Sequence, residues 1–255
     1  MKVFILGSGN VAWHLSKQLQ AHQNIHILGY YSPHGSDKKS DFSPIPFIDL
    51  TKHAAQADVV LAAVSDDALA DIAKLPIEAP IWVHTAGSGH WPSGIPTQQA
   101  QFGVLYPLQT FSRNKIINWS SVPLLIEWPT PQWPATIQTL ADALSPLQQR
   151  VTSEQRLALH TAAVFACNFT NHCYAIAAAL CQRAEVPFHT LHPLIQETAQ
   201  KALQMNPLDA QTGPAIRRDI STLSQHEKAL ADTAWLSLYQ TLTASIQNLH
   251  TSAIL

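Results

Sequence analysis

The sequence predicts an α/β fold in two parts: an N-terminal domain with a mostly parallel sheet over residues 1–151, and an all-α C-terminal domain over residues 152–255. Up to about residue 150, short apolar runs alternate with segments whose apolar residues recur at helical spacing, which is the pattern of strand–helix–strand units. From Thr152 onward the pattern is helical with little strand signal. A third observation, a glycine-containing turn after the first strand, indicates the kind of α/β domain.

The first strand and the first helix enclose a Gly-x-Gly-x-x-Ala motif. Val3–Leu6 is an apolar run typical of a buried strand, and Val11, Leu15 and Leu19 then recur on one helix face. This order predicts a Rossmann-like dinucleotide-binding domain, because the glycines let the backbone approach a pyrophosphate at the helix N-terminus. An ordinary strand–turn–helix is the alternative. The expected cofactor-binding residues of this turn are Gly7, Ser8, Gly9, Asn10, Val11 and Ala12.

The tip of the second expected strand, Ile25–Tyr31, bears on the choice of dinucleotide. NAD-preferring sites usually place Asp or Glu there for the ribose 2′-hydroxyl, but no acid stands directly after this strand. Ser32, His34 and Lys38 could contact a 2′-phosphate instead, so we expect NADP rather than NAD as the cofactor. A polar surface loop is the alternative, and Asp37 could still reach a ribose.

The rest of the first domain continues the alternation. We expect strands over residues 46–50, 58–64, 81–84, 101–105, 123–128 and 148–152, and helices over residues 52–57, 65–72 and 131–144. Ser65 and Asp66 follow one buried strand, and Thr85 follows the next. Because ligands bind at the carboxyl ends of strands in open α/β sheets, all three are expected cofactor contacts. A plain helix cap explains Ser65 and Asp66 equally well.

The second domain is predicted to begin with a long helix. Thr152 and Gln155 have the spacing of a capping box, and the helical pattern continues to Leu180. Further helices are expected over residues 190–204, 216–230 and 231–249, with a loop at 206–214 because of its Pro and Gly content.

Two polar clusters of this domain are candidates for chemistry. His160, Asn168 and Asn171 form one stripe on an otherwise apolar helix. His160 suits proton transfer near neutral pH and Asn168 suits holding a substrate, so we expect both to be catalytic, with Asn171 binding substrate. Hydrogen bonds to neighbouring helices, or simple exposure, would also explain the stripe.

The second polar cluster is a predicted helix start that carries an arginine. Gly-Pro before a helix directs N–H groups toward an anion, and arginine can bind a carboxylate with two hydrogen bonds. A helix start with surface charges is the alternative. The expected substrate-binding residues here are Thr212, Gly213 and Arg217.

Composition bounds the class of protein. Charged residues make up only 13% of the chain and the net charge is −2, so we expect no nucleic-acid partner. No run approaches eighteen apolar residues, so no membrane span is expected. The three cysteines lack metal-type spacing, which indicates free thiols, a cytoplasmic location and no metal site.

Seven strings carry a family resemblance: residues 7–12, 64–67, 84–88, 106–111, 160–171, 194–198 and 211–217. With them the chain resembles bacterial Rossmann-like proteins that carry domain-of-unknown-function family 2520. The resemblance implies an NADP-type fold and a helical domain like that of pyrroline-5-carboxylate reductase or 6-phosphogluconate dehydrogenase, which often pairs in a homodimer. Ala86 and Tyr106 stand where the family tends to have Ser and His, and Pro33 stands where an arginine is expected.

Together these observations predict an NADP(H)-dependent oxidoreductase. Hydride would pass to or from a small carbonyl or imine substrate bound between the two domains of a homodimer. The departures at Ala86 and Tyr106 keep a second hypothesis open, a non-catalytic dinucleotide-binding dimer that acts as a redox sensor or partner-binding protein. A deazaflavin-dependent reductase is a third possibility.

Overall fold

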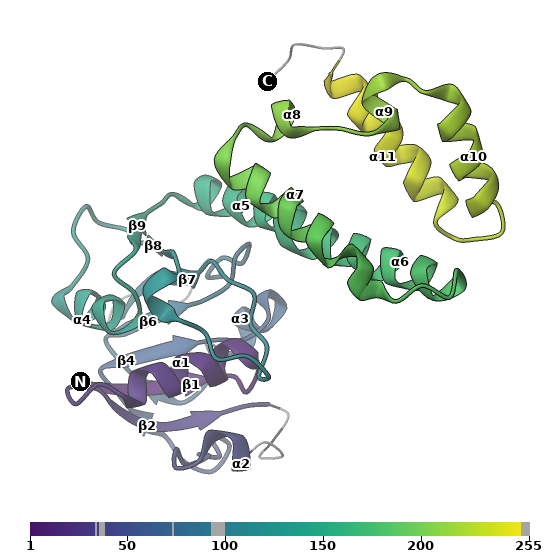
Figure 1. Ribbon diagram of the computed structural model, residues 1–255. Helices are drawn as coiled ribbons and strands as arrows, with labels where there is room; N and C mark the ends of the chain where they lie inside the picture. Colours follow the sequence, from purple (N-terminus) through teal and green to yellow (C-terminus); the bar gives the residue numbers. More distant parts are fainter. Residues whose placement is uncertain (34, 36–38, 73, 93–99, 251–255) are drawn as a thin grey trace. The chain divides into compact units, whose positions relative to one another are not determined.

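The computed structural model describes residues 1–33, 35, 39–72, 74–92 and 100–250 (Figure 1). The chain divides into two compact units, Met1–Asn168 and Phe169–Leu255. The change from mixed strands and helices to helices alone comes earlier, at residue 152, where the sequence places the domain boundary. The division between units therefore lies inside the long helix that begins there.

The first unit is built on a seven-stranded sheet in the order β2-β1-β4-β6-β7-β8-β9 (Figure 1). The first five strands in this order are parallel, β7 and β8 are antiparallel, and β9 runs parallel to β8. The predicted mostly parallel sheet is therefore confirmed. The strands are β1 Lys2–Leu6, β2 His26–Tyr31, β4 Val59–Ala62, β6 Ile81–His84, β7 Gln101–Pro107, β8 Leu124–Glu127 and β9 Gln148–Arg150.

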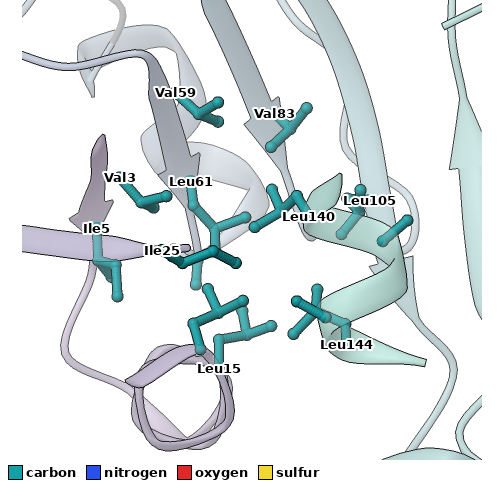
Figure 2. Close-up of a cluster of buried hydrophobic side chains, with 14 of the residues drawn as sticks. Val3, Ile5, Leu15, Ile25, Val59, Leu61, Val83, Leu105, Leu140 and Leu144 are labelled. Atoms are coloured by element: carbon teal, nitrogen blue, oxygen red, sulfur yellow. The ribbon is translucent and has the colours of Figure 1, made fainter. Parts of the chain in front are cut away.

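Both faces of this sheet are covered, as the continuous apolar runs of its strands predict. Successive residues of a strand point to opposite faces, so Val3 and Ile5 enter one core and Phe4 and Leu6 enter the other. On the first face lie α1 (Asn10–Gln20) and α4 (Ala135–Leu144), whose leucines meet those of the sheet (Figure 2). On the second face lies the short helix α3 (Leu69–Ile72).

The segment between β2 and β4 differs from the prediction. Residues 46–50 form no named strand and make one isolated bridge, Tyr30 with Phe47. The helix expected over 52–57 is wrong, because Ala55–Gln56 is a strand (β3) that pairs with Ile77–Glu78 (β5). So short a helix is costly to nucleate, and strand pairing satisfies its backbone groups instead. A short helix, α2 (Lys39–Phe42), and a 3-10 turn, η1 (Asp66–Ala68), were not distinguished in sequence.

The long helix begins with the predicted capping box. The Gln155 N–H donates to Thr152 Oγ1 over 3.2 Å, and the Thr152 N–H donates to Gln155 Oε1 over 2.9 Å. The helix consists of α5 (Ser153–Ala163), a π-helical segment η3 (Val164–Phe169) and α6 (Thr170–Arg183). By length and composition alone, Ser153–Arg183 is apolar enough to cross a membrane. The expectation of no membrane partner stays a prediction.

The second unit contains helices and no strand within the described residues 169–250. Its remaining elements are η4 Phe188–Leu191, α7 His192–Gln204, α8 Pro207–Ala210, α9 Pro214–Arg217, α10 Ile220–Leu230 and α11 Leu236–Leu249. The predicted loop at 206–214 thus contains one short helix. Among the described residues of this unit, Ala215 and Leu230 are the only buried apolar residues.

Candidate functional site

The glycine turn after β1 has the geometry that the motif requires. Gly7 has φ of +113°, and a Cβ on it would lie 2.1 Å from the Ala63 carbonyl oxygen, so only glycine fits. A Cβ on Gly9 would meet nothing within 4 Å. No side chain caps α1, which begins at Asn10. The first N–H groups of this helix therefore face open space, where an anion can bind them.

A cavity of about 620 Å³ lies at the carboxyl ends of the parallel strands. Its volume falls within the range of small-molecule sites. Of the predicted cofactor residues, it brings together Gly7, Ser8, Gly9, Asn10, Val11, Ser32, Ser65, Asp66 and Thr85. Ala12 is buried in the core beside the sheet instead. His34 and Lys38 lie outside the described residues.

At the tip of β2 the cavity is polar. Ser8 Oγ donates to Ser32 Oγ over 3.0 Å, and Ser32 is buried. Arg113 lies beside this pair: its Nη2 donates to the Ser8 carbonyl oxygen over 2.7 Å, and its Nη1 pairs with the Asp41 carboxylate. No sequence pattern predicts a role for Arg113, because it reaches the glycine turn from the loop after β7.

The same loop crosses the start of α1. Asn10 Nδ2 donates to the Phe111 carbonyl oxygen over 2.9 Å, and His14 Nε2 lies 2.9 Å from the Ser112 carbonyl oxygen. Gln109 and Phe111 line the cavity. The loop after β7 therefore forms part of the wall around the glycine turn.

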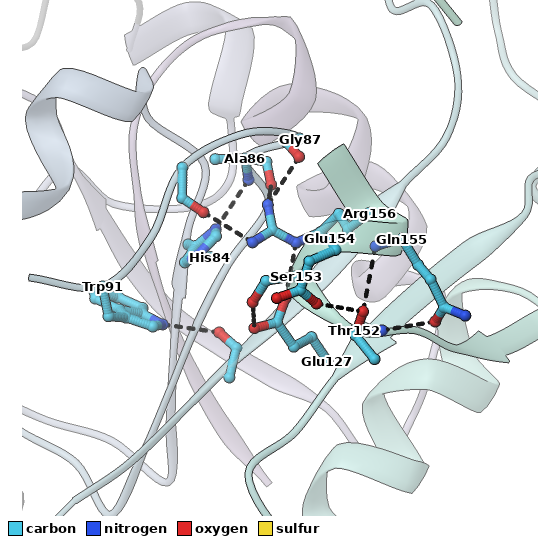
Figure 3. Close-up of polar contacts among 12 residues, drawn as sticks. His84, Ala86, Gly87, Trp91, Glu127, Thr152, Ser153, Glu154, Gln155 and Arg156 are labelled. Carbon is cyan, nitrogen blue, oxygen red and sulfur yellow. Dashed lines mark hydrogen bonds and ion pairs between the residues drawn. The ribbon is translucent and has the colours of Figure 1, made fainter. Parts of the chain in front are cut away.

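Arg156 of α5 forms hydrogen bonds with the backbone of the loop after β6 (Figure 3). Arg156 is 1% exposed. Its Nη1 donates to the carbonyl oxygens of Ala86 and Gly87 over 2.9 and 2.8 Å, and its Nη2 donates to that of Gly89 over 2.9 Å. Its Nε donates to Glu127 Oε2 over 3.0 Å, which places a countercharge beside the buried guanidinium.

His84 fixes the first turn of the same loop. Its Nδ1 accepts the Ala86 N–H over 3.1 Å. Burial, together with the smaller effects of Arg156 and His90, lowers the pKa of His84 to about 3, so the ring is neutral. Since Nδ1 is the acceptor, Nε2 carries the proton. This arrangement makes His84 a structural residue of the loop.

Tyr106 and His160 meet beside Gly87 of this loop. The Tyr106 hydroxyl oxygen lies 2.9 Å from His160 Nδ1, within hydrogen-bond distance. A Cβ on Gly87 would lie 2.4 Å from the same nitrogen, so the His160 ring rests directly on a residue that lines the cavity. Burial raises the pKa of Tyr106; Arg156 lowers it and Asp66 raises it. The phenol therefore keeps its proton at neutral pH.

The predicted stripe on the long helix crosses a π-helical segment after His160. Asn168 lies in the π-helical segment and Asn171 in α6, and both are exposed. Because a π-helical turn contains an extra residue, the angular spacing assumed for a regular helix fails across it. Neither asparagine joins the Tyr106–His160 pair through a hydrogen bond among the described residues.

The other predicted substrate residues belong to the second unit. Thr212 and Arg217 are exposed, and Gly213, with φ of +107°, precedes the four-residue helix α9. Asp219 caps the next helix, α10, by accepting the Thr222 N–H over 3.1 Å. A substrate role for Thr212, Gly213 and Arg217 stays a prediction.

The fold and the cavity define a Rossmann-like protein with a helical C-terminal unit. More particularly, the chain belongs to the family of the domain of unknown function DUF2520, whose model matches residues 122–246. A crystal structure from Bacteroides fragilis, of a protein described as a "putative NADP oxidoreductase", is 35% identical, with a TM-score of 0.85 over 97% of this chain and 98% of that chain.

Two more distant structures show the fold alone. Protein TM1727 of Thermotoga maritima is 18% identical, with a TM-score of 0.77 over 98% of this chain and 100% of that chain. A reductive aminase of Aspergillus terreus, in complex with NADPH and ethyl-5-oxohexanoate, is 11% identical, with a TM-score of 0.70 over 99% of this chain and 94% of that chain. No curated protein matches the sequence.

Proposed function

We propose that this protein is an NADP(H)-dependent oxidoreductase that transfers hydride to or from a small carbonyl or imine compound. One observation carries the proposal: a single cavity joins the glycine turn to the loop on which the Tyr106–His160 pair rests. The wall segment Thr85–Gly87 lines the cavity, and His160 contacts it at Gly87.

The residues of the cavity fit a dinucleotide. The space beside Gly9 and the uncapped N–H groups of α1 would hold the pyrophosphate. Ser8 and Ser32 would lie toward the ribose, and His34 and Lys38 keep their predicted role at a 2′-phosphate. When bound, the nicotinamide supplies or accepts the hydride.

The chain itself would supply the proton. Reducing a carbonyl or imine requires a proton at the oxygen or nitrogen as hydride reaches the carbon. Tyr106 holds a proton at neutral pH, and His160, at hydrogen-bond distance, would replace it after transfer. The predicted catalytic role of His160 is therefore retained, with Tyr106 added as its partner. Asn168, Asn171, Thr212, Gly213 and Arg217 remain proposed substrate contacts.

The relatives support the same class of reaction. The Bacteroides fragilis protein is named for NADP, and the Aspergillus terreus enzyme was crystallised with NADPH and a keto ester. A Cupriavidus necator protein, 15% identical with a TM-score of 0.55 over 97% of this chain and 98% of that chain, was crystallised with NAD. We favour NADP because no acid directly follows β2.

We also propose a homodimer formed through the helical unit. Large apolar side chains of this unit are exposed, such as Leu194 at 63%, Leu203 at 87% and Ile220 at 77%. A unit of this size needs more buried apolar surface than Ala215 and Leu230 provide, and a second copy would supply it. Light scattering after size exclusion should give the mass of two chains. The expected cytoplasmic location and lack of nucleic-acid partners rest on composition alone.

The proposed activity is tested by cofactor binding and turnover. We expect NADPH to bind the purified protein, as seen by fluorescence, and to be oxidised with one member of a panel of ketones, aldehydes and imines. Tyr106→Phe should reduce turnover roughly 100-fold or more while NADPH still binds. Tyr239→Phe is the matched control, because Tyr239 forms a similar pair with His226, 2.9 Å apart, in the second unit.

The outcomes separate the hypotheses. No binding of NADPH or NADH would overturn the proposal. Binding of NADPH with no turnover of any panel member would favour the alternative, a non-catalytic dinucleotide-binding dimer that senses redox state or binds a partner. A deazaflavin retained through purification would instead identify the third possibility.

A further inference from the structure

Arg156 sets the direction of the peptide groups in the loop after β6. The carbonyl oxygens of Ala86 and Gly87 both turn toward its guanidinium (Figure 3). In a trans peptide the N–H of the next residue points opposite to the carbonyl. The N–H groups of Gly87 and Ser88 therefore point away from Arg156, and no described residue accepts a hydrogen bond from either of them.

A carboxylate lies against the same loop. Asp66, at the carboxyl end of β4, accepts the hydroxyl hydrogen of Ser88 at its Oδ2. A Cβ on Gly89 would lie 3.2 Å from Asp66 Cγ, which shows how closely the carboxyl group approaches the loop backbone. Asp66 and Gly87 both line the cavity. Two residues of the cavity wall thus carry a backbone N–H group with no acceptor among the described residues and a carboxylate.

The Gly87 N–H and the Asp66 carboxylate together favour a ligand group that can both accept and donate a hydrogen bond. An anion would be repelled by the Asp66 carboxylate, and a cation would be repelled by the N–H dipole. A primary carboxamide satisfies both, because its oxygen accepts a hydrogen bond and its NH₂ group donates one.

We propose that Gly87 N–H and the Asp66 carboxylate bind the carboxamide of the nicotinamide ring, the first through the carboxamide oxygen and the second through its NH₂ group. This inference rests on the proposed function, since it presumes a nicotinamide cofactor. Arg156 and Ser88 act as positioning residues, one by turning the peptide groups and the other by holding Asp66.

The assignment agrees with the location of the proton-transfer pair. The carbon of nicotinamide that carries hydride is bonded to the carbon that bears the carboxamide. His160 rests on Gly87 and hydrogen bonds with Tyr106, so a ring anchored by its carboxamide at Gly87 lies beside that pair. One anchor would therefore fix both the position and the exposed face of the ring.

The test compares the affinities of two reduced cofactors, NADPH and its 3-acetylpyridine analogue, measured by titration calorimetry. The analogue keeps the carbonyl oxygen but replaces the NH₂ group by a methyl group. We expect the wild-type protein to bind the analogue roughly tenfold more weakly, because a hydrogen bond to a charged acceptor is lost. In Asp66→Ala the affinity for NADPH should fall to that for the analogue, so the ratio approaches one.

Asp67→Ala is the matched control, since Asp67 is the next acid on the same 3-10 turn and is also exposed. In Asp67→Ala, NADPH should still bind roughly tenfold more tightly than the 3-acetylpyridine analogue. Equal affinities of the wild-type protein for both cofactors would overturn the carboxamide assignment while leaving the proposed function intact. An unchanged ratio of the two affinities in Asp66→Ala would also overturn the carboxamide assignment. Failure of the wild-type protein to bind either cofactor would overturn the proposed function itself.

Discussion

Replacing Arg156 by Met tests how the cavity is held together. The guanidinium is 1% exposed and donates to three carbonyl oxygens and one carboxylate. Methionine keeps much of the apolar volume but removes the donor of the three carbonyl oxygens, while the Glu127 carboxylate keeps its hydrogen bond from Ser153. Each hydrogen bond from a charged group contributes about 1.5–3 kcal/mol, but relaxation and water entry prevent simple addition. Removing one partner of a fully buried ion pair typically costs about 3–5 kcal/mol. Because Glu127 is 27% exposed, we expect the free energy of unfolding to fall by an amount near the lower end of that range.

The assay is urea unfolding followed by tryptophan fluorescence. All seven tryptophans except Trp235 lie in the first unit, so the signal reports mainly the unit that contains Arg156. Arg150→Met is the matched control, since Arg150 also donates to two carbonyl oxygens but is exposed. Arg150→Met should lower the free energy of unfolding by less than about 1 kcal/mol. Equal losses of unfolding free energy in the two variants, or a loss below about 1 kcal/mol for Arg156→Met, would contradict the inference that Arg156 holds the loop after β6.

Three further predictions concern the same cavity. Gly7→Ala should destabilise the protein by about 1–3 kcal/mol in urea unfolding, because its Cβ would meet the Ala63 carbonyl oxygen at 2.1 Å; no loss would contradict that contact. Gly9→Ala should change the free energy of unfolding by less than about 1 kcal/mol, since its Cβ meets nothing within 4 Å. The same variant should bind NADPH at least tenfold more weakly by calorimetry, and an unchanged affinity would place the pyrophosphate elsewhere. Because the pKa of His84 is about 3 when folded and about 6.5 when unfolded, the unfolded chain binds the extra proton between these values, so stability should fall as the pH drops from 6.5 toward 3. In His84→Asn, whose side-chain oxygen can still accept the Ala86 N–H, that part of the acid loss should disappear, and an unchanged pH profile would show that His84 titrates normally.

Local sequence patterns were sufficient to predict the structure of segments whose conformation depends mainly on their own residues. Val3–Leu6 alternates between two buried faces of the sheet, Gly7 takes the positive φ that the turn needs, and Thr152 and Gln155 cap the long helix as their spacing predicts. In each case the pattern that predicts the local structure lies within a few positions, even though Val3–Leu6 and Gly7 also contact distant residues. The same reasoning fails at residues 52–57, where pairing with a distant strand decides the structure.

Several polar residues of the cavity wall were predicted, but the long-range contacts that hold them could not be, because their partners meet across the fold. Arg156 holds a loop some 70 residues earlier in the chain, and Arg113 reaches back to the glycine turn. Tyr106 looked like a departure from the family pattern, but it is the hydrogen-bond partner of His160. The π-helical segment has no sequence signal, so the spacing of a regular helix does not give the positions of Asn168 and Asn171 relative to His160.

The central claim is that one cavity holds a nicotinamide cofactor with its ring beside Tyr106 and His160. A crystal structure of the protein with NADPH tests it most directly. We predict the pyrophosphate at the N-terminus of α1, the carboxamide between Gly87 and Asp66, and the hydride-bearing carbon facing the Tyr106 hydroxyl. A nicotinamide ring bound away from Gly87, or a pyrophosphate away from Gly9, would contradict the claim.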